Sequence, residues 1–171
     1  RKIFQGETEF NQDIGSWDVS NVTTMESMFA GTPFDKDISS WDVSKVTDMN
    51  NMFYKATAFN QNLSSWDVSN VTNMSGMFSQ NFIFNQNISN WDVSNVTDMS
   101  FMFYGAQVFN QDISLWDVSS VTNMDRMLAS TDVFNQDLSS WDVSNVTDCQ
   151  NFSSVTVAWT LPKPNFTNCS E

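Results

Sequence analysis

Apolar and polar positions along this chain repeat with a period of about 25 residues. Tryptophans recur at Trp17, Trp41, Trp66, Trp91, Trp116 and Trp141, and phenylalanines keep the same spacing at Phe10, Phe34, Phe59, Phe84, Phe109 and Phe134. The unit reads F-N-Q-[DN]-[IL]-S-x-W-D-V-S-N-V-T-x-M-x-x-M-F, followed by a short variable stretch. A unit of this length is too short to bury its own apolar side, so neighbouring units must stack as a solenoid.

Two different periods meet inside one unit. In residues 65–69 apolar and polar side chains alternate, which predicts a short strand with Trp66 and Val68 inward. In residues 71–78 the apolar spacing changes to i, i+3 and i+4, which predicts a short helical segment. Thr72 is suitably placed to cap that segment. We therefore expect an α/β repeat: a right-handed, leucine-rich-repeat-like solenoid with short parallel strands and short helical turns.

The repeat pattern also divides the chain. Residues 1–9 match the tail of a unit and predict a partial repeat at a truncated end, so we expect the natural protein to continue upstream. Residues 10–152 contain six tandem repeats of about 25 residues. The pattern then decays, because Cys149 and Phe152 replace the two methionines of the last unit. Residues 153–171 are predicted to be a C-terminal cap.

Composition narrows the classes of function. The chain has 171 residues and a formal charge of −13, which opposes binding to nucleic acid or to an anionic membrane. No apolar run is long enough to span a bilayer. Histidine is missing, which removes the commonest general base and a common metal ligand. We predict that the chain is not an enzyme, with no catalytic residues, no cofactor and no transition-metal site.

The repeat resembles a known family. The run from Phe84 to Met99, F-N-Q-N-I-S-N-W-D-V-S-N-V-T-D-M, is similar to the repeat of the BspA-type leucine-rich-repeat surface proteins. The resemblance covers roughly residues 10–152 and implies a surface location, a solenoid fold and roles in adhesion or attachment. It implies no catalytic residue and no cofactor. The chain departs from the pattern at Asp35-Lys36, in place of Asn-Gln, and at Leu128, in place of Phe.

Two regular columns allow more than one interpretation. The tryptophans either form an inward core ladder, as their alternation with Asp and Ser favours, or an exposed aromatic strip for stacking sugars. The aspartates of W-D-V would lie ~4.8 Å apart on stacked strands, and their repulsion must be offset. Asx-turn hydrogen bonds within each unit are the favoured explanation. A Ca²⁺-binding strip is the alternative; its residues would be Asp18, Asp42, Asp67, Asp92, Asp117 and Asp142.

The two cysteines and the last sequons are the remaining candidate sites. Cys149 and Cys169 are predicted to form a disulfide that clamps the tail over the last unit, since the two cysteines of an otherwise cysteine-free secreted chain are usually bonded to each other. A buried free Cys149 that replaces methionine is the alternative. Ten N-x-[ST] sequons occur, mostly within the repeat itself. Those of the tail are candidate N-glycosylation sites: Asn151, Asn165 and Asn168.

These observations predict an extracellular or cell-surface scaffold that mediates adhesion or binding. Its partner would be a protein or glycan on another surface. One alternative is a structural building block that self-associates into an extracellular fibre or appendage. A minor alternative is binding of cations, ice or mineral along the polar ladders.

Overall fold

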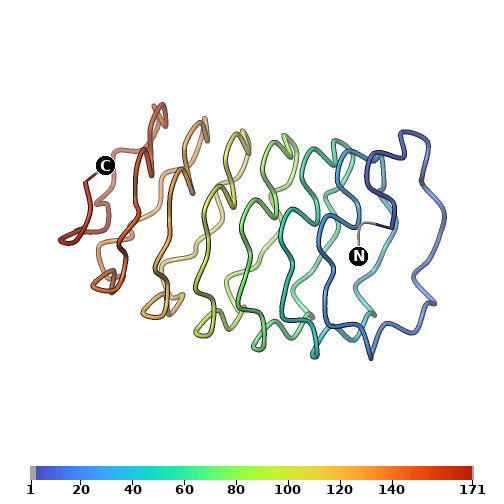
Figure 1. Ribbon diagram of the computed structural model, residues 1–171. Helices are drawn as coiled ribbons and strands as arrows, with labels where there is room; N and C mark the ends of the chain where they lie inside the picture. The colour runs from blue at the N-terminus through green and yellow to red at the C-terminus, as the bar shows by residue number, and fades with distance from the viewer. Residues whose placement is uncertain (1–2, 171) are drawn as a thin grey trace.

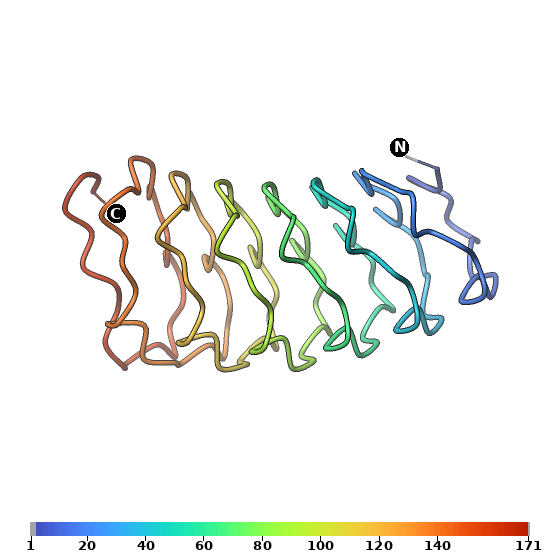
Figure 2. The same ribbon diagram turned by 90° about the horizontal axis from the view of Figure 1, so that it is seen from below.

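In the computed structural model, which describes residues 3–170, the chain winds through a stack of similar rungs. The two ends of the chain lie at opposite ends of this stack (Figures 1 and 2). We number the rungs from the phenylalanine that begins each repeat: rung 1 is residues 10–33, rung 2 is 34–58, rung 3 is 59–83, rung 4 is 84–108, rung 5 is 109–133 and rung 6 is 134–158.

The predicted α/β repeat of leucine-rich type is wrong. Residues 3–170 contain no helix, and no extended strand forms in this range. What regular pairing exists is five isolated parallel bridges that link successive rungs, from Thr24↔Asp48 to Asn123↔Asp148. The described chain therefore has no helix that could cross a bilayer.

Overlapping β-turns replace the predicted helical segment at 71–78. Met77 N–H donates to Met74 O at 3.2 Å and Ser79 N–H to Gly76 O at 3.0 Å, the spacing of β-turns. The N–H groups between them point to the next rung: Gly76 donates to Ser100 O at 2.8 Å and Phe78 to Met102 O at 2.9 Å. Because every second N–H donates to a carbonyl of the next rung, the i→i−4 hydrogen bonds of a helix cannot form.

Left-handed backbone positions fix these turns. The residue at the Gly76 position has a positive φ in every rung: Ser27, Asn51, Gly76, Phe101, Arg126 and Asn151. A type II turn needs a positive φ at its third residue, and an α-helix excludes it. Thr72 is no helix cap, because its hydroxyl donates to Thr47 O of the preceding rung at 3.2 Å.

The W-D-V segments are extended but form no strand. Trp66 and Val68 are buried while Asp67 is exposed, so the predicted alternation of side chains is confirmed. Among the described residues, no backbone bonds join these segments between rungs. Side chains make the links instead: Trp66 Nε1 donates to Ile38 O at 3.1 Å, and Asn70 Nδ2 to Ser44 O at 2.8 Å. A ladder built from side chains does not satisfy the backbone pattern of a sheet.

Two phenylalanine columns fill the core. Phe53 of rung 2 stacks on Phe59, the first residue of rung 3, at 3.9 Å between ring centroids, and it lies 5.6 Å from Phe78 of rung 3. The tryptophans of rungs 2–6 are 3–5% exposed, which confirms the core ladder for these five, while Trp17 is 46% exposed. Leu128 is fully buried in place of a phenylalanine. The core is one continuous aromatic and aliphatic stack.

The short interval of 24 residues between Trp17 and Trp41 results from one residue fewer before Phe34. In rung 2 the corresponding loop is closed by Phe59 N–H donating to Ala56 O at 3.1 Å. In rung 1 the hydroxyl of Thr32 donates to Phe29 O at 2.8 Å and accepts from Phe34 N–H at 3.4 Å. A side chain thus replaces the missing backbone turn.

The tail lies against rung 6. Cys149 and Cys169 are joined by a disulfide, as the sequence predicts, with their Cα atoms 5.9 Å apart. Phe166 contacts Phe152 edge to face at 5.0 Å between centroids. Trp159 Nε1 donates to Gln136 O at 2.9 Å, and Leu138 N–H donates to Pro162 O at 3.0 Å. These contacts cover the core side of rung 6; the boundaries proposed for the partial repeat and the cap remain predictions.

Candidate binding surface

The aspartate column of W-D-V is held by the serine two residues on. In rung 3 the N–H and the hydroxyl of Ser69 both donate to Asp67 Oδ1, at 3.1 and 2.6 Å. The same Asx turn occurs in the other rungs; its residues are Asp18, Asp42, Asp92, Asp117 and Asp142. The favoured Asx-turn explanation is confirmed for the whole column.

These serine bonds outweigh the repulsion between neighbouring carboxylates. The Ser44 hydroxyl, then its N–H, holds the pKa of Asp42 below its ordinary value, although Asp18 acts in the opposite direction. Asp92 and Asp117 show the same balance, with pKa values lowered by Ser94 and Ser119. Within residues 3–170, no three acidic, cysteine or histidine side chains gather as a metal site. In each carboxylate of the considered Ca²⁺ strip, Oδ1 therefore accepts within a structural turn, and binding of Ca²⁺ along the strip remains a prediction.

Threonines and asparagines form two further exposed columns. Thr72, Thr97, Thr122 and Thr147 each donate their hydroxyl to the threonine carbonyl of the preceding rung, at 3.1–3.4 Å. Asn70, Asn95 and Asn145 donate their amides to serine carbonyls of the preceding rung, at 2.7–2.8 Å. In the tail Asn168 donates to Ser144 O in the same way. Both columns connect rungs as well as facing solvent.

The asparagine and glutamine of F-N-Q form a third ladder. Asn110 N–H donates to Asn85 Oδ1 at 3.0 Å, and Gln111 Nε2 donates to Asn85 O at 2.8 Å. The same bonds recur one rung on, at Asn135 and Gln136. Each asparagine therefore receives both a backbone and a side-chain donor from the following rung, which couples the two rungs at this corner.

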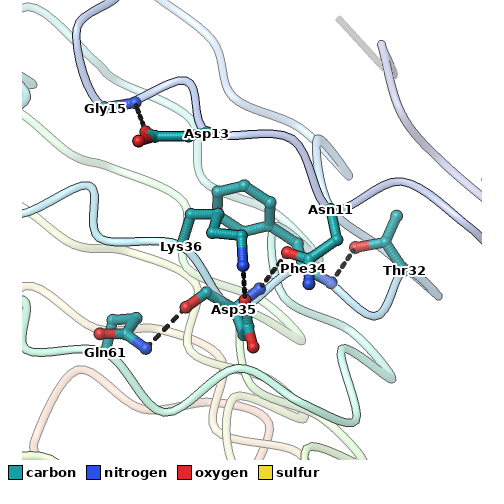
Figure 3. Close-up of polar contacts among 8 residues, drawn as sticks. All are labelled: Asn11, Asp13, Gly15, Thr32, Phe34, Asp35, Lys36 and Gln61. Carbon is teal, nitrogen blue, oxygen red and sulfur yellow. Dashed lines mark hydrogen bonds and ion pairs between the residues drawn. The ribbon is translucent and has the colours of Figure 1, made fainter.

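Rung 2 interrupts this ladder at Asp35-Lys36 (Figure 3). Asp35 N–H still donates to Asn11 Oδ1 at 3.1 Å, and Gln61 Nε2 to Asp35 O at 2.7 Å. The Asp35 carboxylate, however, lies 2.9 Å from Lys36 Nζ, an ion pair in which Oδ1 accepts no aligned hydrogen bond. Lys36 beside it lowers the pKa of Asp35. The N–H of Asn60 forms no bond to Asp35, so the link between rungs 2 and 3 is incomplete here.

We expect the double change Asp35→Asn/Lys36→Gln to raise the free energy of unfolding by about 1 kcal/mol. It supplies the amide acceptor and the amide donor that rungs 4 and 5 use, and one net hydrogen bond contributes about that much. Urea denaturation measures the effect. Asp35→Ala/Lys36→Ala is the matched control, because it removes the same ion pair without adding an amide. If the alanine pair stabilises the chain equally, completion of the ladder is not the cause.

An open depression lies over rung 3, on the face of the overlapping β-turns. Its volume is about 400 Å³, and small residues of rung 3 form its floor. Asn50, Asn51 and Tyr54 of rung 2 line one side, and Phe101 and Tyr104 of rung 4 line the other. The repeat pattern does not indicate this site, because its residues differ from the repeat. Gly76, where other rungs carry a side chain, was the available signal.

The three sequons of the tail are accessible. Asn151, Asn165 and Asn168 are all exposed. Asn168 uses one amide hydrogen for its bond to Ser144 O. Their geometry is compatible with modification, and N-glycosylation at these positions remains a prediction.

A family model described as "Mycoplasma protein of unknown function, DUF285" matches residues 1–87 and 62–160. No curated protein and no solved structure matches the chain.

Proposed function

The chain belongs to the family of Mycoplasma proteins of unknown function DUF285, and we propose that it is a non-enzymatic binding scaffold of the cell surface or extracellular space. One observation carries the proposal: the same polar columns recur on rung after rung. The aspartates are fixed by Asx turns within their own rung, and the threonines, asparagines and glutamines by bonds to the preceding rung. Such a surface holds identical groups at constant spacing, which suits contact with an extended partner. The partner class we propose is a protein or glycan on another surface.

The chemistry of the columns supports binding over catalysis. Catalytic acids and bases have pKa values near the working pH, whereas the Ser94 hydroxyl and N–H lower that of Asp92 further. Its carboxylate is an acceptor in a structural turn. The Cys149–Cys169 disulfide supports an oxidising compartment. The resemblance of the repeat to BspA-type surface proteins also favours a location at the cell surface.

Adhesion under flow tests the proposal. Beads that carry the oxidised chain should be retained on a surface coated with extracellular-matrix proteins and glycans. Beads that carry albumin are the control, and albumin-coated surfaces correct for non-specific retention. Labelling of intact cells with an antibody to the chain should equal that of permeabilised cells. Equal retention of both kinds of bead, or labelling only after permeabilisation, would contradict the proposal.

Self-assembly is the second candidate, because an apolar column is exposed next to the polar ones. Ile83, Val108 and Val133 are 41–45% exposed at matching positions of rungs 3–5, and Phe82 beside Ile83 is 42% exposed. Apolar patches of this kind mark association surfaces. Sedimentation velocity should then show concentration-dependent association that Val108→Asp abolishes, with Leu115→Asp as the exposed control. A monomer at every concentration would exclude assembly through this column.

A further inference from the structure

We propose that the depression over rung 3 binds a neutral saccharide, an inference that rests on the proposed binding function and names one of its sites.

The depression exists because rung 3 carries small residues where its neighbours carry large ones. Ser79 occupies the position held by Tyr54 in rung 2 and Tyr104 in rung 4. Gly76 occupies the position of Asn51 and Phe101. Two aromatic walls therefore stand on either side of a floor that is one rung wide. Successive rungs are spaced like the rings Phe53–Phe78 and Phe78–Phe103, at 5.6 and 5.8 Å, which leaves room for a flat ring between the walls.

The aromatic wall of rung 4 is held in place from behind. Phe101 and Tyr104 contact each other edge to face at 5.8 Å between centroids. Arg126 of rung 5 lies over the Phe101 ring, 5.4 Å from its centroid. Because this guanidinium comes from the side away from rung 3, the opposite ring face is left for a ligand. The electron-rich face of an aromatic ring attracts the C–H groups of a pyranose.

The polar floor is ordered before any ligand binds. Asn51 Nδ2 donates to Asn50 Oδ1 at 2.7 Å, and Asn50 Nδ2 donates to Ser75 Oγ. The Asn51 amide lies directly against Gly76, since a Cβ atom at Gly76 would come 2.1 Å from Asn51 Oδ1. Amides and hydroxyls offer donors and acceptors together, as sugar hydroxyls require. Tyrosine with serine, glycine and asparagine is also the composition of many binding surfaces.

The ligand class follows from charge and size. The lining residues include no acidic or basic side chain, in a chain with a net charge of −13. Two nearby cations lie against the aromatic walls, Lys55 over Tyr54 at 5.1 Å and Arg126 over Phe101 at 5.4 Å. No charged side chain lines the depression itself to pair with a charged ligand, and a neutral ligand needs none. The volume of about 400 Å³ lies in the lower part of the range of small-molecule sites, roughly 300–1,000 Å³. One or two sugar units of an oligosaccharide fit this description best.

The test is a titration followed by amide NMR shifts. Cellotriose, maltotriose and mannotriose are added to the oxidised chain, and a trisaccharide that contains glucuronic acid is the charged comparison. We expect at least one neutral trisaccharide to bind with a dissociation constant of about 1 mM. The shifted amides should be those around Tyr54, Gly76 and Tyr104.

Variants then locate the site. Tyr54→Ala and Tyr104→Ala should each weaken binding about three- to tenfold, the fold-change that one stacking contact typically contributes. Gly76→Ala should also weaken it about tenfold, because the new methyl displaces Asn51. Gly31→Ala in rung 1 is the matched control. Gly31 also has a positive φ, of 71°, but it does not line the depression and its Cβ would meet only the backbone of Gly6, with Cα at an ordinary 3.8 Å, so affinity should change less than twofold. Melting curves verify that each variant is folded.

The proposal is overturned if no neutral trisaccharide binds, if the charged one binds more tightly, or if the folded tyrosine variants bind as the parent does. The bead assay separates this failure from that of the wider function. Beads that adhere while trisaccharides do not bind leave the scaffold function standing without this site. Beads that do not adhere contradict the scaffold function itself.

Discussion

Replacing Trp66 by alanine is expected to lower the free energy of unfolding by about 3–5 kcal/mol, the usual cost of truncating a buried tryptophan. Trp66 is 3% exposed, and its Nε1 donates to Ile38 O of the preceding rung. The change therefore leaves a cavity between rungs 2 and 3 and removes a link between them. Urea denaturation followed by circular dichroism measures the loss.

Two variants separate the contributions. Trp17→Ala changes the same residue type at a position that is 46% exposed, and it should cost less than half as much. Trp66→Phe keeps an aromatic ring but leaves Ile38 O without its indole donor, and about 1 kcal/mol of its cost reflects that hydrogen bond. Equal losses for Trp17→Ala and Trp66→Ala would mean that burial in the tryptophan column does not determine stability.

Removing the disulfide is expected to have the next largest effect. Cys169→Ala should lower the free energy of unfolding by about 3 kcal/mol, because the bond closes a loop of 20 residues in the unfolded chain. The tail from residue 153 should also become the first site of limited proteolysis. Its remaining contacts, such as the Phe152–Phe166 pair, must hold it without a covalent link.

A matched variant tests whether packing or cross-linking matters at Cys149. Cys149→Met/Cys169→Ala removes the bond and restores the methionine found at this buried position in the earlier rungs. It should regain about 1 kcal/mol over Cys169→Ala, since methionine fills space that cysteine leaves. If Cys169→Ala unfolds at the same urea concentration as the oxidised parent, the clamp contributes nothing.

The repeat and its core could be predicted from the sequence, and the backbone conformation could not. Spacing alone identified the buried columns of Trp66 and Val68. The i, i+3, i+4 pattern of Met74, Met77 and Phe78 was misleading, because overlapping β-turns bury the same positions as a helical turn. The bonds that decide between the two structures join different rungs, and no single repeat contains both partners.

A clue to the turns was nevertheless present. Gly76 in one rung and Gly31 and Gly105 in others mark two columns where every residue has a positive φ. Because equivalent positions share one backbone conformation, a glycine in one copy indicates the conformation of them all. The candidate site gave a similar signal, because Gly76 and Ser79 differ from the residues at the same positions of rungs 2 and 4. The residues that recur in every unit indicate how the units pack and give no sign of this site.

The bonds between rungs join residues a fixed 24 to 26 positions apart at most sites, for example Phe78 to Met102 and Asn85 to Gln111. If one whole unit were duplicated or deleted in the gene, each remaining residue that bonds to another rung would still face an equivalent partner there. Loss of a single residue is accommodated in the loop before Phe34, where the Thr32 side chain makes the bonds that close it. The number of units thus sets the length of the stack: each added unit extends it by one rung, close to the 5.6–5.8 Å between equivalent phenylalanine rings, without any new fold.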